Sequence, residues 1–319
     1  LFPGGFTPQF AGNVLDFSLL GGLRGELDNG LTYDFSARTG ESEIRYTLFN
    51  TVNPSLGNTL GNSNTPTRFR PGDLINQETQ FQADFTYEFD AGLANPAVLA
   101  FGSSYMAESY EVVEGDPASY ATGPYARQDP WDLCNADATA APNGLTAIAG
   151  GSTLNCADPD DPVYQVVGVG SNGFPGYSPQ FTGVYERDSF SFYGELSADV
   201  TDQLFLQGAV RYENYDDFDS EVVYQLAGRF EVTDYVALRG SLGTGFRAPT
   251  PGQQGTVNVS TLLPNGFPVA TGLFPANGPV AAALGATPLR PETSNNFTVG
   301  LTATLGELDL TIDYYRIDI

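Results

Sequence analysis

Apolar and polar residues alternate through most of the chain, and residues 235–250 show this pattern at full length. Leu238 and Leu242 fall on one face of that stretch, whereas Arg239 and Ser241 fall on the other. A period of two is that of a β-strand with one apolar and one polar face. The stretch is also about twice as long as an ordinary globular strand. It therefore predicts a long, two-faced strand.

The same alternation recurs along the chain and predicts ten strands in all. The clearest case sets Phe81, Phe85 and Phe89 against Asp84 and Glu88. Isolated charges cost several kcal/mol when buried, so the second face has to be wet or paired. The predicted strands cover residues 13–26, 31–49, 81–89, 96–113, 183–200, 204–213, 222–232, 235–250, 297–304 and 308–319.

The predicted connections alternate between short and long. Tight turns fall near residues 28, 92, 202, 234 and 306, and longer loops fall near residues 60, 145, 217 and 270. Residues 114–180 show no sustained period, which is improbable inside a compact soluble domain. Short turns at one end and long loops at the other are typical of outer-membrane barrels, whose spanning strands need only about 9–11 residues. The pattern predicts an all-β, transmembrane antiparallel β-barrel.

Three motifs in order resemble the C-terminal barrel of TonB-dependent outer-membrane receptors. They are GTGFRAPTPGQ at 243–253, LRPETSNNFTVGL at 289–301 and LDLTIDYYRIDI at 308–319. Shorter pieces at 53–57, 115–126 and 210–218 fit the same family, so the resemblance covers essentially the whole chain. It implies a barrel of about 22 strands around an N-terminal plug. Residues 1–319 are then expected to be a partial barrel without the plug, the TonB-contacting segment or the terminal strands.

That resemblance implies active uptake of a scarce nutrient, such as a siderophore, cobalamin or an oligosaccharide, at the bacterial outer membrane. The implied partners are the small nutrient ligand, TonB through the plug, and outer-membrane lipid and lipopolysaccharide. A passive porin or a purely structural barrel would share the same strand pattern. An extracellular β-rich adhesin without membrane contact is a third reading, and detergent-free solubility would favour it.

Composition excludes several other classes. The net charge is −25 and all thirteen basic residues are arginine, so no patch is expected to neutralise nucleic-acid phosphates. The chain has no histidine, which removes Ser-His-Asp and Cys-His catalysis and histidine-type metal sites. A G-x-G-x-x-G match at 168–173 is followed by Phe-Pro-Gly where a dinucleotide-binding fold needs a helix. No enzymatic activity, cofactor or metal site is expected.

The candidate binding residues are aromatic side chains of the long loop and arginines of the polar faces. The loop aromatics, which either line a ligand site by stacking or pack the loop on itself, are Tyr120, Tyr125, Trp131, Tyr164, Phe174 and Tyr177. The arginines expected to face the lumen are Arg211, Arg229, Arg239 and Arg247. Arg239 and Arg247 are expected to pair with acids of neighbouring strands, with an anionic ligand or carboxylates of the plug as the alternatives. Acidic clusters at 158–161 and 216–221 are read as solvated loops, with calcium binding as the alternative.

Two cysteines, Cys134 and Cys156, lie in the same long loop. A zinc site would need further ligands that the chain lacks. In an oxidising compartment the pair is expected to form a disulfide, whose loop-closure entropy is worth roughly 3 kcal/mol. Two free thiols are the alternative.

Overall fold

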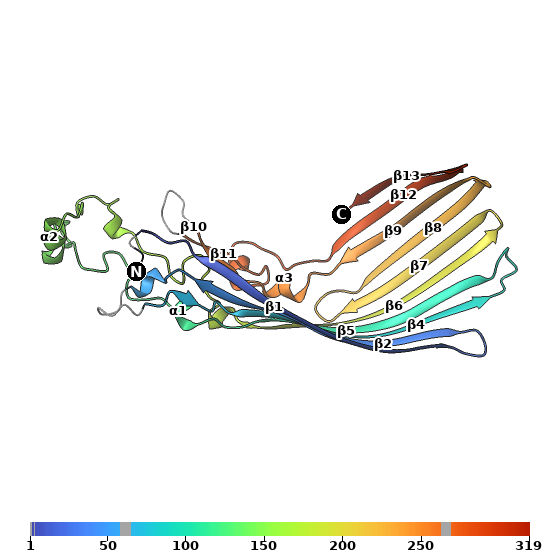
Figure 1. The fold of residues 1–319 in the computed structure, drawn as a ribbon, viewed down its shortest axis with the longest axis horizontal. Helices are drawn as coiled ribbons and strands as arrows, with labels where there is room; N and C mark the ends of the chain where they lie inside the picture. Colours follow the sequence, from blue (N-terminus) through green and yellow to red (C-terminus); the bar gives the residue numbers. More distant parts are fainter. Residues whose placement is uncertain (1, 3, 58–64, 263–268) are drawn as a thin grey trace.

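Ten long strands run up and down in sequence order and form one antiparallel sheet in the computed structural model (Figure 1). The structure describes residues 2, 4–57, 65–262 and 269–319, and these statements concern that part of the chain. The long strands are β1 (Gln9–Glu26), β2 (Thr32–Phe49), β4 (Asp73–Phe89), β5 (Ala97–Val112), β6 (Gly183–Thr201), β7 (Leu204–Tyr215), β8 (Glu221–Thr233), β9 (Val236–Arg247), β12 (Glu292–Leu305) and β13 (Leu308–Asp318). A short strand, β3 (Arg68–Phe69), pairs with β2.

The strand registers place the predicted apolar residues together on one face of the sheet. Leu226 of β8 lies opposite Leu242 of β9, and Leu301 of β12 lies opposite both Leu238 and Ile312. Apart from the half-buried Leu301, these side chains are exposed, with Leu226 at 55% and Ile312 at 60%. A continuous apolar surface of this size marks contact with a membrane or a partner. The prediction of an outward apolar face is confirmed.

The two ends of the sheet differ as predicted (Figure 1). At the turn end, strands are joined by residues 27–31, 90–96, 202–203, 234–235 and 306–307. The first of these turns closes with the Leu27 N–H donating to the Leu31 carbonyl at 2.9 Å, and Gly30 supplies a φ of +84°. At the loop end, the connections are residues 50–72, 113–182, 216–220 and 248–291.

The structure corrects the predicted start of the third strand. The sequence pattern places this start at Phe81, but β4 begins at Asp73. Residues 76–80 are all polar, so they carry no two-faced signal although they are fully paired with β2 and β5. Alternation reports where one face is apolar, and the strands continue beyond that region.

The long loops, predicted to be without periodic structure, contain short helices and a hairpin. Every one of these helices begins at a proline, whose fixed φ is suited to a first helical position. They are η1 (Pro54–Leu56), α1 (Pro117–Tyr120), α2 (Pro142–Ala149), η3 (Pro162–Tyr164), η4 (Pro179–Phe181), α3 (Pro251–Gly255) and α4 (Pro279–Ala283). The hairpin is β10 (Asn258–Leu262) with β11 (Val269–Leu273).

The helices of the described part are all too short, or too polar, to cross a bilayer.

Candidate functional site

The loops fold back over the polar face of the sheet at its loop end, and the best-buried side chains lie beneath them. Leu48 of β2 and Phe69 of β3 are paired in register and are each 1% exposed. Leu48 is an even number of positions from Arg38 along β2, so its side chain lies on the same, polar face of the sheet. We call the covering layer the cap, which comprises residues 50–57, 65–72, 113–125, 170–177 and 248–257.

Asn53 is the best-connected side chain of the cap, and it is fully buried. Its Nδ2 donates to the carbonyls of Ala118 and Ala121 at 3.0 and 2.9 Å. Its Oδ1 accepts from the backbone N–H of Ser55 at 3.1 Å and from the Ser55 hydroxyl at 2.7 Å. The amide therefore uses its full hydrogen-bonding capacity, and it joins the first long loop to α1.

A third segment, residues 170–177, is hydrogen-bonded to α1 and to the first long loop. The Ser119 carbonyl accepts from the N–H groups of Ser171 and Gly176 at 2.8 and 3.1 Å. The Thr51 hydroxyl donates to the Asn172 carbonyl at 2.6 Å. Across the described residues, every buried side-chain nitrogen or oxygen has a hydrogen-bond partner. A network in which every group is satisfied keeps the loops in one arrangement, because any shift would leave buried polar groups without hydrogen-bond partners.

Arg187 of β6 anchors the last part of the cap. Its guanidinium is only 4% exposed, forms an ion pair with Glu108 of β5, and donates from Nη1 to the Pro249 carbonyl at 2.5 Å. The guanidinium carbon also lies 4.9 Å from the centre of the Tyr215 ring, in cation–π geometry. A single side chain thus connects three strands to the segment that follows β9.

The segment after Pro249 lies flat against the polar face. Thr250 and Gln253 form a capping box, with the Gln253 N–H donating to the Thr250 hydroxyl at 3.2 Å. A Cβ at Gly255 would lie 2.2 Å from the Tyr185 ring, so only glycine fits there. The motif that carried the family resemblance at 243–253 therefore has a structural task, which is to turn the chain inward onto β5 and β6.

The rest of the long loop, residues 126–166, forms a disulfide lobe beyond the cap, with α2 at its far end (Figure 1). Cys134 and Cys156 form a disulfide with their Cα atoms 5.6 Å apart. Asp129 accepts the N–H groups of Leu133 and Cys134 at 2.8 and 2.7 Å and fixes the first cysteine.

Replacing both cysteines with alanine is expected to destabilise the lobe alone. The bridge spans 22 residues, for which loop-closure entropy predicts a loss of about 3 kcal/mol in the local unfolding free energy. Protease cleavage between residues 134 and 156 should accelerate, and the denaturant midpoint of the sheet should stay unchanged. An equal fall in the sheet midpoint would contradict the separation of lobe and barrel.

The structure brings the six predicted ligand-binding aromatics together only as two pairs, Trp131 with Tyr125 and Phe174 with Tyr177. Trp131 is 54% exposed and lies 5.7 Å from Tyr125, centre to centre. Phe174 packs 4.8 Å from Phe10 of β1, and the other three are engaged in the loops themselves. Tyr120 donates to Glu114, Tyr164 donates to the Cys156 carbonyl at 2.7 Å, and Tyr177 is 7% exposed. Stacking on a ligand stays a prediction, now centred on Trp131 and Tyr125.

The four predicted arginines lie on the polar face, and three of them form ion pairs. Arg211 contacts Glu213 and Arg229 contacts Glu231, each at 2.8 Å along the same strand. Arg239 reaches across β12 to Asp313 at 2.5 Å, passing over Gly300, where a Cβ would lie 1.9 Å from the carboxylate. Arg247 lies opposite Glu292 in register. Whether any of them contacts a ligand stays a prediction.

The predicted acidic clusters have local structural roles. Asp161 accepts the N–H groups of Asn155 and Val163 at 2.7 and 2.9 Å. Asp216, Asp217 and Asp219 line an open cavity of about 760 Å³ with Arg290. Among the described residues, no group of three or more His, Cys, Asp or Glu side chains is placed to hold a metal ion.

Three loop residues outside the strands have shifted pKa values. Burial raises the pKa of the Tyr177 hydroxyl, and the nearby Tyr110 and Tyr46 add to the shift. The hydrogen bond to Glu114 raises the pKa of Tyr120. The hydroxyl and N–H of Thr139 lower the pKa of Asp137. Both tyrosines therefore stay neutral, and Asp137 stays charged, around neutral pH.

Sequence reasoning missed the two residues that organise the site, Asn53 and Arg187. Asn53 lies in the NPSLG segment, and Arg187 lies near the start of a predicted strand. Their partners lie 65, 68 and 79 residues away. The one available signal was the charge of Arg187, which falls on the polar face of β6.

Comparisons with known proteins show which family model and which solved structures the chain resembles. A family model described as the β-barrel of TonB-dependent receptor-like proteins matches residues 14–319. The siderophore receptor PirA of Acinetobacter baumannii is 15% identical, with a TM-score of 0.56, over 96% of this chain and 35% of that protein. The ferric enterobactin receptor PfeA of Pseudomonas aeruginosa is 14% identical, with a TM-score of 0.55, over 96% of this chain and 35% of that protein. The RagAB peptide transporter is 14% identical, with a TM-score of 0.54, over 97% of this chain and 30% of that protein. No curated protein sequence matches the chain.

Proposed function

The chain belongs to the TonB-dependent receptor family, and on that premise we propose that it forms part of an outer-membrane receptor for active uptake of a nutrient. The chain spans about a third (35%) of the length of the solved receptors that it matches. The plug and the segment that receives energy from TonB are, in this proposal, supplied by residues outside 1–319.

One observation carries the proposal: a two-faced wall whose polar face is covered by loops at one end only. In an outer-membrane barrel, the apolar face meets hydrocarbon and the long loops lie outside the cell. The cap then lies over the external mouth of the lumen, where an incoming ligand arrives. A rigid cap with few alternative arrangements suits selective capture, because binding then costs little ordering.

The charge of the loops points to the class of ligand. Residues 113–182 carry eight carboxylates and one arginine. A surface of one sign raises the local concentration of ligands of opposite sign and repels those of like sign. We therefore propose a neutral or cationic ligand, captured in part by stacking on the exposed Trp131.

The test is uptake in the native host. Strains that lack the receptor gene, or tonB, are compared with their parent for growth on ferric siderophores, cobalamin, peptides and oligosaccharides, each supplied as the limiting nutrient. We expect one nutrient to depend on both genes and on the proton gradient. Uptake that needs the receptor but persists without tonB would identify a passive porin-like barrel instead.

A further inference from the structure

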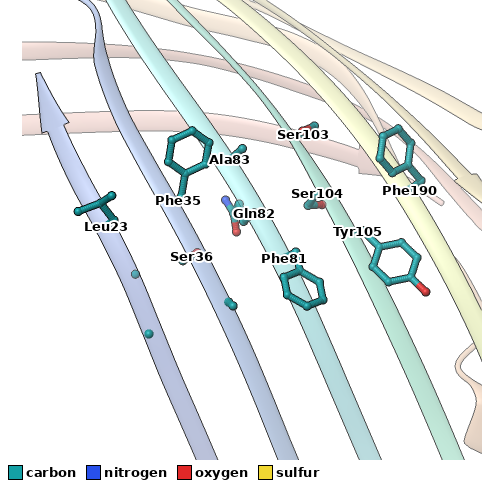
Figure 2. A pocket seen from close by; sticks show the side chains of 13 residues that line it. Leu23, Phe35, Ser36, Phe81, Gln82, Ala83, Ser103, Ser104, Tyr105 and Phe190 are labelled. Carbon is teal, nitrogen blue, oxygen red and sulfur yellow. The ribbon is translucent and has the colours of Figure 1, made fainter. Parts of the chain in front are cut away.

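A depression of about 510 Å³ lies on the apolar face of the sheet, between β1 and β6 (Figure 2). Two neighbouring rows of paired residues form it. From β1 to β6, the row nearer the loop end is Gly21, Ala37, Phe81, Tyr105 and Phe190, and the row nearer the turn end is Leu23, Phe35, Ala83 and Ser103.

The order of large and small residues makes the depression an oblique groove. Small side chains occupy β1 and β2 in the row nearer the loop end but β4 and β5 in the row nearer the turn end. The floor therefore shifts by one row toward the turn end, from Gly21 and Ala37 to Ala83 and Ser103. Leu23 and Phe35 stand on one side of this track, and Phe81 stands on the other. Phe81 and Tyr105 lie with their rings 6.5 Å apart and reinforce that wall.

The groove ends where the apolar face becomes polar. The Tyr105 hydroxyl donates to Asp188 at 3.0 Å, toward the loop end. In the next row toward the loop end, Thr39 and Thr79 share a hydrogen bond of 3.1 Å. One row further, Gln77 donates to Glu41 at 2.7 Å. Tyrosine with its hydroxyl directed to polar groups is typical of the boundary between hydrocarbon and headgroups. The groove therefore lies just inside the hydrocarbon, in the leaflet nearer the loops.

We propose that this groove binds one acyl chain of an outer-leaflet membrane lipid. Its walls are hydrocarbon and aromatic rings, its direction follows a single narrow track, and it continues the membrane-facing surface. Its polar border supplies hydroxyl, amide and carboxylate groups for the headgroup. A second depression, of about 350 Å³ between β7 and β12, is lined by Leu206, Leu226 and Leu242. Its single aromatic lining residue is Phe297, so it lacks the two facing aromatic walls of the groove, and we assign it only ordinary contact with lipid.

The test fills the groove and counts retained lipid. A Cβ at Gly21 meets no atom within 4 Å, so Gly21→Leu is the variant chosen to place a side chain in the groove. Gly194 has the same open surroundings on the same face, but it lies outside the groove. Gly194→Leu is therefore the matched control. The full-length receptor and both variants are purified from outer membranes and weighed by native mass spectrometry after detergent exchange.

We expect one lipid on the parent protein and on Gly194→Leu, and at least about tenfold less on Gly21→Leu, since losing contact with two methylene groups has that effect. Ala83→Leu, on the floor in β4, serves as a second filling variant, and heat-dependent gel mobility checks that each variant is folded. Retention by both filling variants, a parent protein without lipid, or a mass of two protein copies without lipid would each overturn the proposal.

Discussion

Replacing Arg187 with alanine is expected to lower the free energy of unfolding by about 3–5 kcal/mol, the usual effect of removing one partner of a buried ion pair. Glu108 would lose its cationic partner while its side chain is only 12% exposed. The Pro249 carbonyl would lose its donor, and the Tyr215 ring would lose the cation beside it. The change is measured by denaturant unfolding of the full-length protein in detergent, together with protease cleavage of residues 248–257.

Arg38→Ala is the matched control. Arg38 also pairs with a glutamate across two strands of the polar face, at 2.9 Å, but the side chains of Arg38 and Glu78 are 47% and 37% exposed. An exposed pair is worth about 0–1 kcal/mol, so this variant should unfold close to the parent. Equal losses in the two variants would show that burial of Arg187 is unimportant.

A second substitution separates two effects of Arg187→Ala: the unpaired carboxylate of Glu108 and the lost hydrogen bond to the Pro249 carbonyl. In the Arg187→Ala background, Glu108→Gln removes the uncompensated carboxylate but does not restore the bond to Pro249. Stability should recover in part, whereas cleavage of residues 248–257 should stay fast. The coupling between the two sites then follows from the double-mutant cycle. Full recovery of both readouts would mean that Pro249 is held by something other than Arg187.

The barrel wall was predictable because its determinants are local. Alternation such as Phe81, Phe85 and Phe89 against Asp84 and Glu88 needs only neighbouring residues, and so does the Asn29-Gly30 turn. The register then follows, since a slip of one residue would move every apolar side chain to the wrong face. The prediction of where β4 starts was wrong because residues 76–80 are polar on both faces of the strand.

The cap was not predictable, for a reason of the opposite kind. Asn53, Ser119 and Arg187 are common polar residues whose roles depend on partners far along the chain. The residues next to Asn53 in the sequence do not indicate that its side chain donates to the carbonyls of Ala118 and Ala121. The six loop aromatics were a reasonable guess from composition, but folding used most of them for internal packing. Only the exposed Trp131, with Tyr125 beside it, keeps the surface that stacking requires.

Asn53→Ala is expected to loosen the cap while leaving the barrel wall intact. The substitution would leave the Ala118 carbonyl and the Ser55 N–H without partners, whereas the Ser55 hydroxyl and the Ala121 carbonyl would keep their bond to each other at 3.3 Å. Each buried group left without a partner costs about 1–3 kcal/mol, so the local unfolding free energy of the cap should fall by roughly 3–5 kcal/mol. Hydrogen exchange at the N–H groups of Gly123 and Tyr125, which are bound to Ser55, should accelerate by at least about a hundredfold.

Asn143→Ala provides the comparison within the same long loop. Asn143 is exposed and makes a single side-chain bond, to the Trp131 carbonyl at 3.3 Å, so its loss should stay within about 0.5 kcal/mol. Asn53→Asp is more informative, because it preserves shape but replaces both donors with a charge that faces two carbonyls. It should be at least as damaging as alanine. If instead aspartate were tolerated and exchange at Gly123 stayed slow, packing alone would hold the cap, and the hydrogen-bond network would have no part in fixing the loops.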